Sequence, residues 1–229
     1  MKKILIIGGN SDIGLELLNS FLNYKNFSVH IHYNKKILYN KITNTIKFIK
    51  KDLSKINDKN LNKYFDNNYD IIINLVGYVS NQSFMNLTIK EIQKTILINS
   101  LVPLLIIRNS LKNMSKKKFG RIINTSSVGV KFGGGATTFS YSLSKHLNEF
   151  MPSEIKHLAS NNILYNTLRI GVTDTRFHKK IKKKSLQKRI KLIPLKKMAT
   201  TKDIARYITY LIFENNFITN EVVNITGGE

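Results

Sequence analysis

The sequence predicts an α/β fold in which helices cover both faces of a mostly parallel, seven-stranded, doubly wound sheet. Short β-type runs alternate with segments long enough for helices, and no flexible linker or internal repeat divides the 229 residues. Parallel strands need long crossover connections, and the intervening segments supply them. Ligands of such sheets bind outside the carboxyl ends of the strands.

Seven runs are expected to form the strands, and the length suits one domain over residues 1–229. They are Lys3–Ile7, Ser28–Tyr33, Ile46–Ile49, Asp70–Asn74, Arg121–Thr125, Ile163–Arg169 and Glu221–Ile225. After the first run, Ile13, Leu17 and Phe21 recur at helical spacing and form one apolar stripe.

Composition narrows the class of protein. The chain has no cysteine, which excludes disulfides, thiolate metal sites and cysteine nucleophiles and favours a reducing compartment. The apolar run Ile4–Ile7 is too short for a signal peptide, and Ile96–Ile107 is too short to span a bilayer. We therefore expect a cytoplasmic protein without a membrane partner.

The formal net charge is +23, a field that could attract nucleic acid or acidic partners. The excess is nearly all lysine and accompanies abundant Asn, Ile, Phe and Tyr, all residues with A/T-rich codons. Codon composition accounts for the charge better than nucleic-acid binding does. A regulator or nucleic-acid-associated protein remains the last alternative.

A glycine-rich segment, Gly8 to Gly14, follows the first run and leads into the first predicted helix. Glycines here permit a tight turn and a close approach of backbone to a pyrophosphate, which a helix N-terminus then stabilises. Asn10 and Ser11 add side-chain donors. A plain strand-to-helix turn is the alternative interpretation.

This segment resembles the TGxxxGxG loop of short-chain dehydrogenases/reductases, a Rossmann-type family, with Ile7 in place of Thr and Asp12 in place of the middle Gly. The resemblance continues over the whole chain: Asp52-Leu53, the Asn74–Gly77 segment, residues 166–175, residues 194–205 and the closing strand match family motifs in order. It implies the following cofactor-binding residues: Gly8, Asn10, Ser11, Asp12, Ile13, Tyr33, Asn34, Lys35, Asp52, Leu53, Asn74, Val76, Gly77, Tyr141, Lys145, Gly171, Val172, Thr173 and Thr175.

Tyr141 and Lys145 lie four residues apart in a helical stretch and therefore share a face. A phenol with a pKa of about 10 needs a neighbouring cation to act as acid and base near neutral pH. The resemblance makes Tyr141 the acid/base, Lys145 the residue that lowers its pKa and holds the nicotinamide ribose, and Ser127 the residue that orients the substrate oxygen. Ser126 is the minor alternative to Ser127, and Asn99 matches the residue that orders a water chain.

The resemblance implies NAD(P)H-dependent interconversion of a carbonyl and a secondary alcohol, without a metal. His30 and His32 share a strand face without a third ligand, which favours strand packing over metal binding. The second strand ends in His32-Tyr33-Asn34-Lys35-Lys36, without the carboxylate that NAD specificity usually needs. NADP(H) is therefore favoured over NAD(H).

Residues 172–197 correspond to the substrate lid of the family, and their charge predicts an anionic substrate, with a solvated basic helix as the alternative. The basic residues are Arg176, His178, Lys179, Lys180, Lys182, Lys183, Lys184, Lys188, Arg189 and Lys191. A 3-oxoacyl-carrier-protein reductase is the specific rival to a general carbonyl reductase. The resemblance also implies a homodimer or homotetramer joined through the helices that carry Leu97–Ile107 and Tyr141–Leu158.

Overall fold

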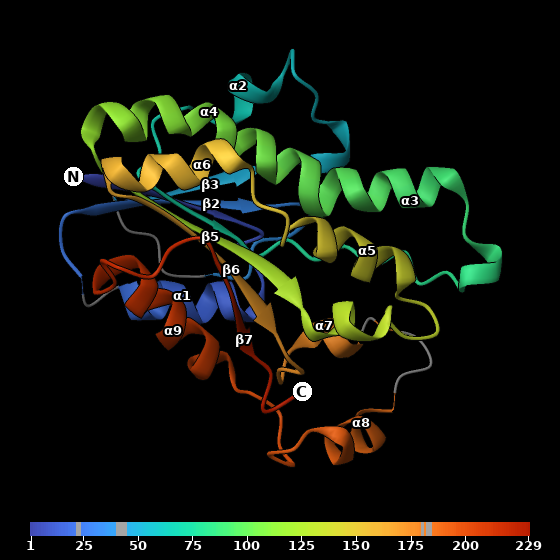
Figure 1. Ribbon diagram of the computed structural model, residues 1–229. Coiled ribbons are helices and arrows are strands. Elements are labelled where there is room, and N and C mark those ends of the chain that lie inside the picture. Colours follow the sequence, from blue (N-terminus) through green and yellow to red (C-terminus); the bar gives the residue numbers. More distant parts are fainter. Residues whose placement is uncertain (22–23, 40–44, 180, 182–184) are drawn as a thin grey trace.

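The computed structural model describes residues 1–21, 24–39, 45–179, 181 and 185–229, and only the backbone of Lys179. All seven predicted strands form, in one parallel sheet of order β3-β2-β1-β4-β5-β6-β7 (Figure 1). The strands are β1 (Lys2–Ile7), β2 (Phe27–Tyr33), β3 (Ile46–Lys50), β4 (Ile71–Asn74), β5 (Gly120–Ser127), β6 (Ile163–Ile170) and β7 (Glu221–Ile225). The order reverses beside β1, so the prediction of a doubly wound sheet is confirmed.

Helices cover both faces of the sheet (Figure 1). The α-helices are α1 (Asp12–Phe21), α2 (Leu61–Tyr64), α3 (Ile89–Ile96), α4 (Val102–Lys117), α5 (Phe139–Leu147), α6 (Ser153–His157), α7 (Arg176–Lys179), α8 (Leu186–Leu192) and α9 (Thr201–Phe213). A short π-helix, η3 (Leu97–Leu101), joins α3 to α4, and 3₁₀ turns complete the connections.

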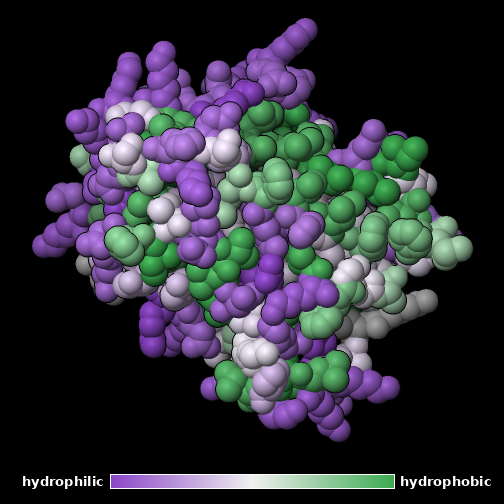
Figure 2. Space-filling model, in the orientation of Figure 1, coloured by the Kyte–Doolittle hydropathy of each residue, from purple (hydrophilic) through white to green (hydrophobic). Residues whose placement is uncertain are grey.

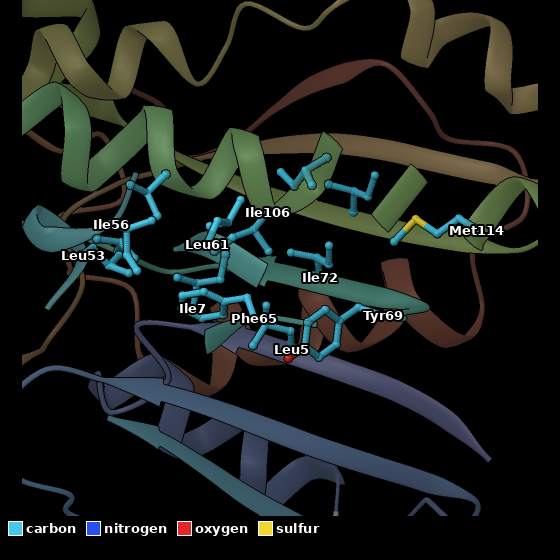
Figure 3. Close-up of a cluster of buried hydrophobic side chains, with 14 of the residues drawn as sticks. Leu5, Ile7, Leu53, Ile56, Leu61, Phe65, Tyr69, Ile72, Ile106 and Met114 are labelled. Carbon is cyan, nitrogen blue, oxygen red and sulfur yellow. The ribbon is translucent and has the colours of Figure 1, made fainter. Parts of the chain in front are cut away.

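The alternation of side chains along β1 divides the core into two layers. Leu5 and Ile7 pack with Ile106 of α4 on one face of the sheet (Figure 3). Ile4 and Ile6 pack on the other face, with Leu17 of α1 and with residues of α9. Because successive strand side chains point to opposite faces, an unbroken apolar run is what a strand covered on both sides requires.

The helix expected over Tyr141–Leu158 is broken, contrary to the prediction. Helix α5 ends at Leu147, and α6 begins at Ser153 after Pro152. Proline lacks an amide donor and disfavours helical backbone in the residue before it, so Pro152 prevents one continuous helix, and a new helix starts at Ser153. The break turns the polar end of α5, including Asn148, inward to the sheet.

The longest helical stretch runs from Ile89 to Lys117 and includes η3. Its length and apolar composition would suffice to cross a membrane, a property that core helices share. Here Val102, Ile106 and Met114 are buried against the sheet. The stretch therefore serves as a core helix of this fold.

We expect Gly14→Ala to destabilise the fold by about 1–3 kcal/mol, because its Cβ would lie 2.2 Å from the carbonyl oxygen of Gly9. Gly135→Ala is the matched control, since its Cβ would meet only the Thr138 hydroxyl, at 3.5 Å. Urea unfolding measures both. Equal midpoints for the two variants would contradict the close approach of the turn to the helix.

Candidate active site

A cavity of about 750 Å³ opens at the carboxyl ends of the strands, within the size range of small-molecule sites. The turn after β1, the end of β2, the segment after β4, the end of β5, α5 and α7 all contribute to its wall. Every predicted site residue lines this cavity except Asn74, Val172 and Asn99. The structure thus brings residues from Gly8 to His178 together in one place.

The glycine-rich turn takes its shape from positions that tolerate no side chain. Gly8 has a φ of +75°, and a Cβ there would lie 3.1 Å from the backbone of Leu75. The amide of Ser11 donates to the carbonyl of Gly8, and the Ser11 hydroxyl accepts from the amide of Gly14. Asp12 is the first residue of α1. The N-terminus of this helix therefore faces the cavity, with the backbone amides that a helix leaves without intrahelical partners.

His32 supports this turn, a role that the sequence did not reveal. Its Nδ1 accepts from the amide of Gly8 at 3.1 Å, and its Nε2 lies 2.8 Å from the carbonyl oxygen of Lys51. This pattern fixes a neutral ring with the proton on Nε2, and burial lowers the pKa of His32. The ring is thereby a fixed acceptor beneath the glycine turn.

No cluster of three His, Cys, Asp or Glu side chains able to hold a metal occurs in the described part of the chain. Both histidines of β2 have other partners. The Nδ1 atom of His30 lies 3.0 Å from the Tyr69 hydroxyl, and the ring of His32 is held as described above. These contacts agree with strand packing.

The two serines at the end of β5 have different partners. The Ser126 hydroxyl donates to Glu149 at 2.5 Å, and Arg169 holds the same carboxylate with two hydrogen bonds, of 2.8 and 2.7 Å. Ser127 instead forms a hydrogen bond with the Tyr141 hydroxyl and accepts from the amide of Gly129 at 3.2 Å. Partner choice therefore favours Ser127 over Ser126 as the serine that acts with the tyrosine.

Tyr141 is a neutral phenol in this arrangement. Burial raises the pKa of Tyr141 to about 12, although the hydrogen bond with Ser127 opposes the shift. The Lys145 ammonium lies 5.9 Å from the centre of the Tyr141 ring. That Lys145 lowers the pKa of the phenol stays a prediction.

Lys145 is almost fully buried and has only neutral partners. Its Nζ donates to the carbonyl oxygens of Val76 at 2.7 Å and Thr125 at 2.9 Å, and to the Thr125 hydroxyl at 3.0 Å. Burial lowers the pKa of Lys145 to about 7, because these oxygens do not replace the hydration of an ammonium. The amine thus gains or loses its proton near neutral pH.

Asn99 lies behind the cavity wall, in η3. Its side chain is buried and accepts from the amide of Tyr78, while its Nδ2 donates to the carbonyl of Tyr78 and the hydroxyl of Ser144. These bonds join the segment after β4 to helix α5. Single π-helical turns occur frequently at functional sites, and this one places an asparagine between two walls of the cavity.

A ladder of buried amides continues behind the site. Asn74 donates to Asn124 at 2.7 Å, and Asn148 donates to the carbonyl oxygens of Asn99 and Thr125 at 3.2 and 3.0 Å. The carbonyl of Asn74 accepts from the Thr125 hydroxyl, the group that also binds Lys145. Asn74 therefore holds the strand ends in place behind the cavity wall. Neither Asn124 nor Asn148 was predicted, because their partners are distant along the chain.

Helix α7 closes one side of the cavity, where Phe177 was not predicted as a site residue and Arg176 was predicted only as a basic residue of the lid. The Phe177 ring lies against Tyr141, with centres 5.3 Å apart, and a Cβ on Gly77 would lie 3.3 Å from it. Arg176 forms an ion pair with Asp12, 2.5 Å from Nε to the carboxylate. The lid thus contacts both the tyrosine and the glycine turn.

The basic character of the lid is only partly directed at the cavity. Among the described lid cations, Arg176 and His178 line it, whereas Arg189 of α8 pairs with Glu229. Lys180 and Lys182–Lys184 lie outside the described residues.

A protein-family model described as enoyl-(acyl carrier protein) reductase matches residues 50–229. A curated relative, the 3-oxoacyl-acyl-carrier-protein reductase of Aquifex aeolicus, is 29% identical over 77% of this chain and 74% of its own.

Solved structures agree in fold. A 4-hydroxyisoleucine dehydrogenase mutant, complexed with NADH and succinate, has a TM-score of 0.84 and 29% identity, covering 99% of this chain and 98% of its own. The structure of ElxO with NADP bound has a TM-score of 0.82 and 24% identity over the same shares of the two chains, and shows the fold alone.

The predicted quantity is the difference between the unfolding free energies of the wild type and of Lys145→Met. We expect this difference to increase with pH. Between the folded pKa of about 7 and the ordinary value of 10.5, the unfolded chain binds a proton that the folded chain does not. Stability is therefore lost as pH falls, and the difference should change by about 1.4 kcal/mol per pH unit between about pH 7.5 and 9.5.

Urea unfolding across this pH range measures the difference. The exposed Lys112→Met controls for the loss of one positive charge at the surface. Parallel curves for the wild type and Lys145→Met would show that the amine stays charged in the folded protein.

Proposed function

The chain belongs to the short-chain dehydrogenase/reductase family, and we propose that it is an NAD(P)H-dependent oxidoreductase that interconverts a carbonyl and a secondary alcohol. The observation that carries the proposal is the position of Ser127, Tyr141 and Lys145 on the wall of the same cavity as the glycine-rich turn. A proton donor and a dinucleotide-type turn in one cavity are what carbonyl reduction by hydride transfer requires.

The residues present fit a dinucleotide. Gly8 and Gly14 let the turn pack closely against the segment after β4 and against α1, and the turn and the start of α1 line the cavity, where a diphosphate can approach the backbone amides. Asp52 and Leu53 line the same cavity. We assign the adenosine end to the β2 side and the nicotinamide end to Tyr141, with Gly171, Thr173 and Thr175 beside it.

When bound, the nicotinamide supplies the hydride. Tyr141 donates its proton to the carbonyl oxygen, and Ser127 orients that oxygen by a hydrogen bond. A phenol whose pKa is raised to about 12 remains protonated at neutral pH, so the site holds the proton that the reductive direction consumes.

Lys145 and Asn99 act behind the reacting groups in this proposal. Lys145 binds the nicotinamide ribose and, with a pKa near 7, returns a proton towards Tyr141. Asn99 holds the segment after β4 against α5 and in this way helps to order a water chain that replaces the proton. Asn99 is in this sense a positioning residue.

The end of β2 favours NADP(H). Lys35 and Lys36 line the cavity and are exposed, and a 2′-phosphate needs cations at this place. Similar structures contain NADH or NADP, so likeness alone does not decide between the two.

A 3-oxoacyl-acyl-carrier-protein reductase is the second candidate. It is supported by the name of the curated relative and by the positive charge of residues 172–197, which would attract an acidic carrier protein. A small anionic carbonyl would use the same charge, of which Arg176 and His178 reach the cavity.

We further propose a cytoplasmic homo-oligomer that joins through α4 and α5. Apolar side chains gather over α3, α4 and α5 in Figure 2, and Leu101, Leu104, Leu147 and Phe150 are 45%, 37%, 41% and 86% exposed. An apolar patch of this kind is typical of an interface. No nucleic-acid or membrane partner is needed for the reaction.

Titration with NADPH and with NADH, followed by nicotinamide fluorescence, tests the cofactor site. The wild type should bind NADPH more tightly, and a Lys35→Ala, Lys36→Ala double variant should lose about tenfold in NADPH affinity with little change for NADH. Failure to bind either cofactor would overturn the proposed function. Equal losses for both cofactors would remove the 2′-phosphate assignment alone.

Turnover of paired substrates distinguishes the candidate substrates. For the carrier-protein reductase, a 3-oxoacyl thioester on an acidic carrier protein should give a higher kcat/KM than the same thioester on a small thiol, and the advantage should shrink as salt is added. A phosphorylated carbonyl compared with its neutral analogue tests the small-anion alternative in the same assay. No preference in either pair would reject an anionic substrate.

A further inference from the structure

The contact between Arg176 and Asp12 joins the lid directly to the glycine-rich turn. Arg176 donates twice to the Asp12 carboxylate, from its amide at 2.6 Å and from Nε at 2.5 Å, and once to the carbonyl of Asn10 from Nη2 at 3.3 Å. The side chains of Arg176 and Asp12 are 44% and 22% exposed. All three residues line the cavity.

Asp12 places a negative charge where the proposed ligand needs a positive field. It is the first residue of α1, and the positive end of a helix dipole favours an anion at this position. A carboxylate there takes up part of that field and repels a diphosphate that approaches the same turn. This is also the position at which the chain departs from the glycine of the family loop.

Arg176 is the described cation that compensates this charge. Its guanidinium binds Asp12 and the Asn10 carbonyl at once, so it lies across the turn. We propose that Arg176 determines the affinity of the cofactor site, because it neutralises Asp12, whose charge would otherwise repel the diphosphate of the dinucleotide. This inference rests on the proposed function.

The geometry separates this role from that of a simple lid anchor. The amide of Arg176 also donates to Asp12, so the backbone of the lid stays attached to α1 when the guanidinium is removed. Arg176→Met keeps that bond and much of the side-chain volume, and Asp12→Asn keeps an acceptor oxygen. The two variants therefore change charge with little change in anchoring.

Charge compensation predicts effects of opposite sign. Arg176→Met leaves Asp12 uncompensated beside the diphosphate and should weaken NADPH binding about tenfold. Asp12→Asn removes the repulsion and should leave affinity unchanged or tighter. The variant that combines Asp12→Asn with Arg176→Met should bind NADPH with an affinity within about threefold of that of Asp12→Asn alone. Without the Asp12 charge, loss of the guanidinium leaves no uncompensated carboxylate beside the diphosphate.

The experiment is this double-mutant cycle, measured by fluorescence titration with NADPH and by calorimetry with ADP, which has the diphosphate but no nicotinamide. Arg108→Met is the matched control, since Arg108 also pairs with an aspartate, Asp58, but does not line the cavity. Arg176→Lys should recover part of the loss, because it restores the charge without the forked geometry.

Equal weakening by Arg176→Met and Asp12→Asn would overturn the inference and make the pair an anchor of the lid. A loss confined to NADPH and absent with ADP would also overturn it, since the effect would then arise beside Phe177 and Tyr141. If the wild type binds neither NADPH nor NADH, the proposed function itself fails, a result distinct from both of these.

Discussion

The site depends on the buried amine of Lys145, which pairs with no carboxylate in the described part of the chain. Lys145 of α5 donates to the carbonyl oxygens of Val76 and Thr125. Val76 follows β4, and Thr125 lies near the end of the neighbouring strand β5. An ammonium surrounded by neutral oxygens costs free energy, and the fold limits that cost by lowering the pKa of the amine towards neutrality. Parallel topology makes the arrangement available, because the carboxyl ends of adjacent strands meet at one edge of the sheet.

Neutral groups, rather than charges, hold this cation in place. Asn74 and Asn148 bridge the strand ends and η3, and the Thr125 hydroxyl connects Asn74 to Lys145. Carboxylates in these places would pair with the ammonium and keep it charged, which would remove the titration near neutral pH. The buried amide ladder thus fixes the geometry of the site and leaves the amine free to exchange its proton.

Strand positions followed from apolar runs, and the tyrosine and lysine followed from their spacing, because both signals are local in sequence. The family motif already favoured Ser127 over Ser126, and the structure adds a reason that the sequence could not show, because the Ser126 hydroxyl binds Glu149, which Arg169 also holds. Contacts between residues far apart in the chain were missed because spacing and periodicity carry no information about them. Examples are the contacts of Arg176 with Asp12 and of His32 with Gly8. Pro152 could have predicted the break between α5 and α6. It was overlooked because the family resemblance implied one helix over Tyr141–Leu158.

The most direct measurement follows the hydrogen itself, with NADPH deuterated at C4 of the nicotinamide and a panel of carbonyl compounds. The account predicts that the wild type transfers deuterium to the carbinol carbon of the alcohol. Tyr141→Phe should bind the cofactor with similar affinity and transfer at least about a hundredfold more slowly, because the proton donor is gone. Absence of transfer by the wild type, or transfer that persists in Tyr141→Phe at the same rate, would contradict it.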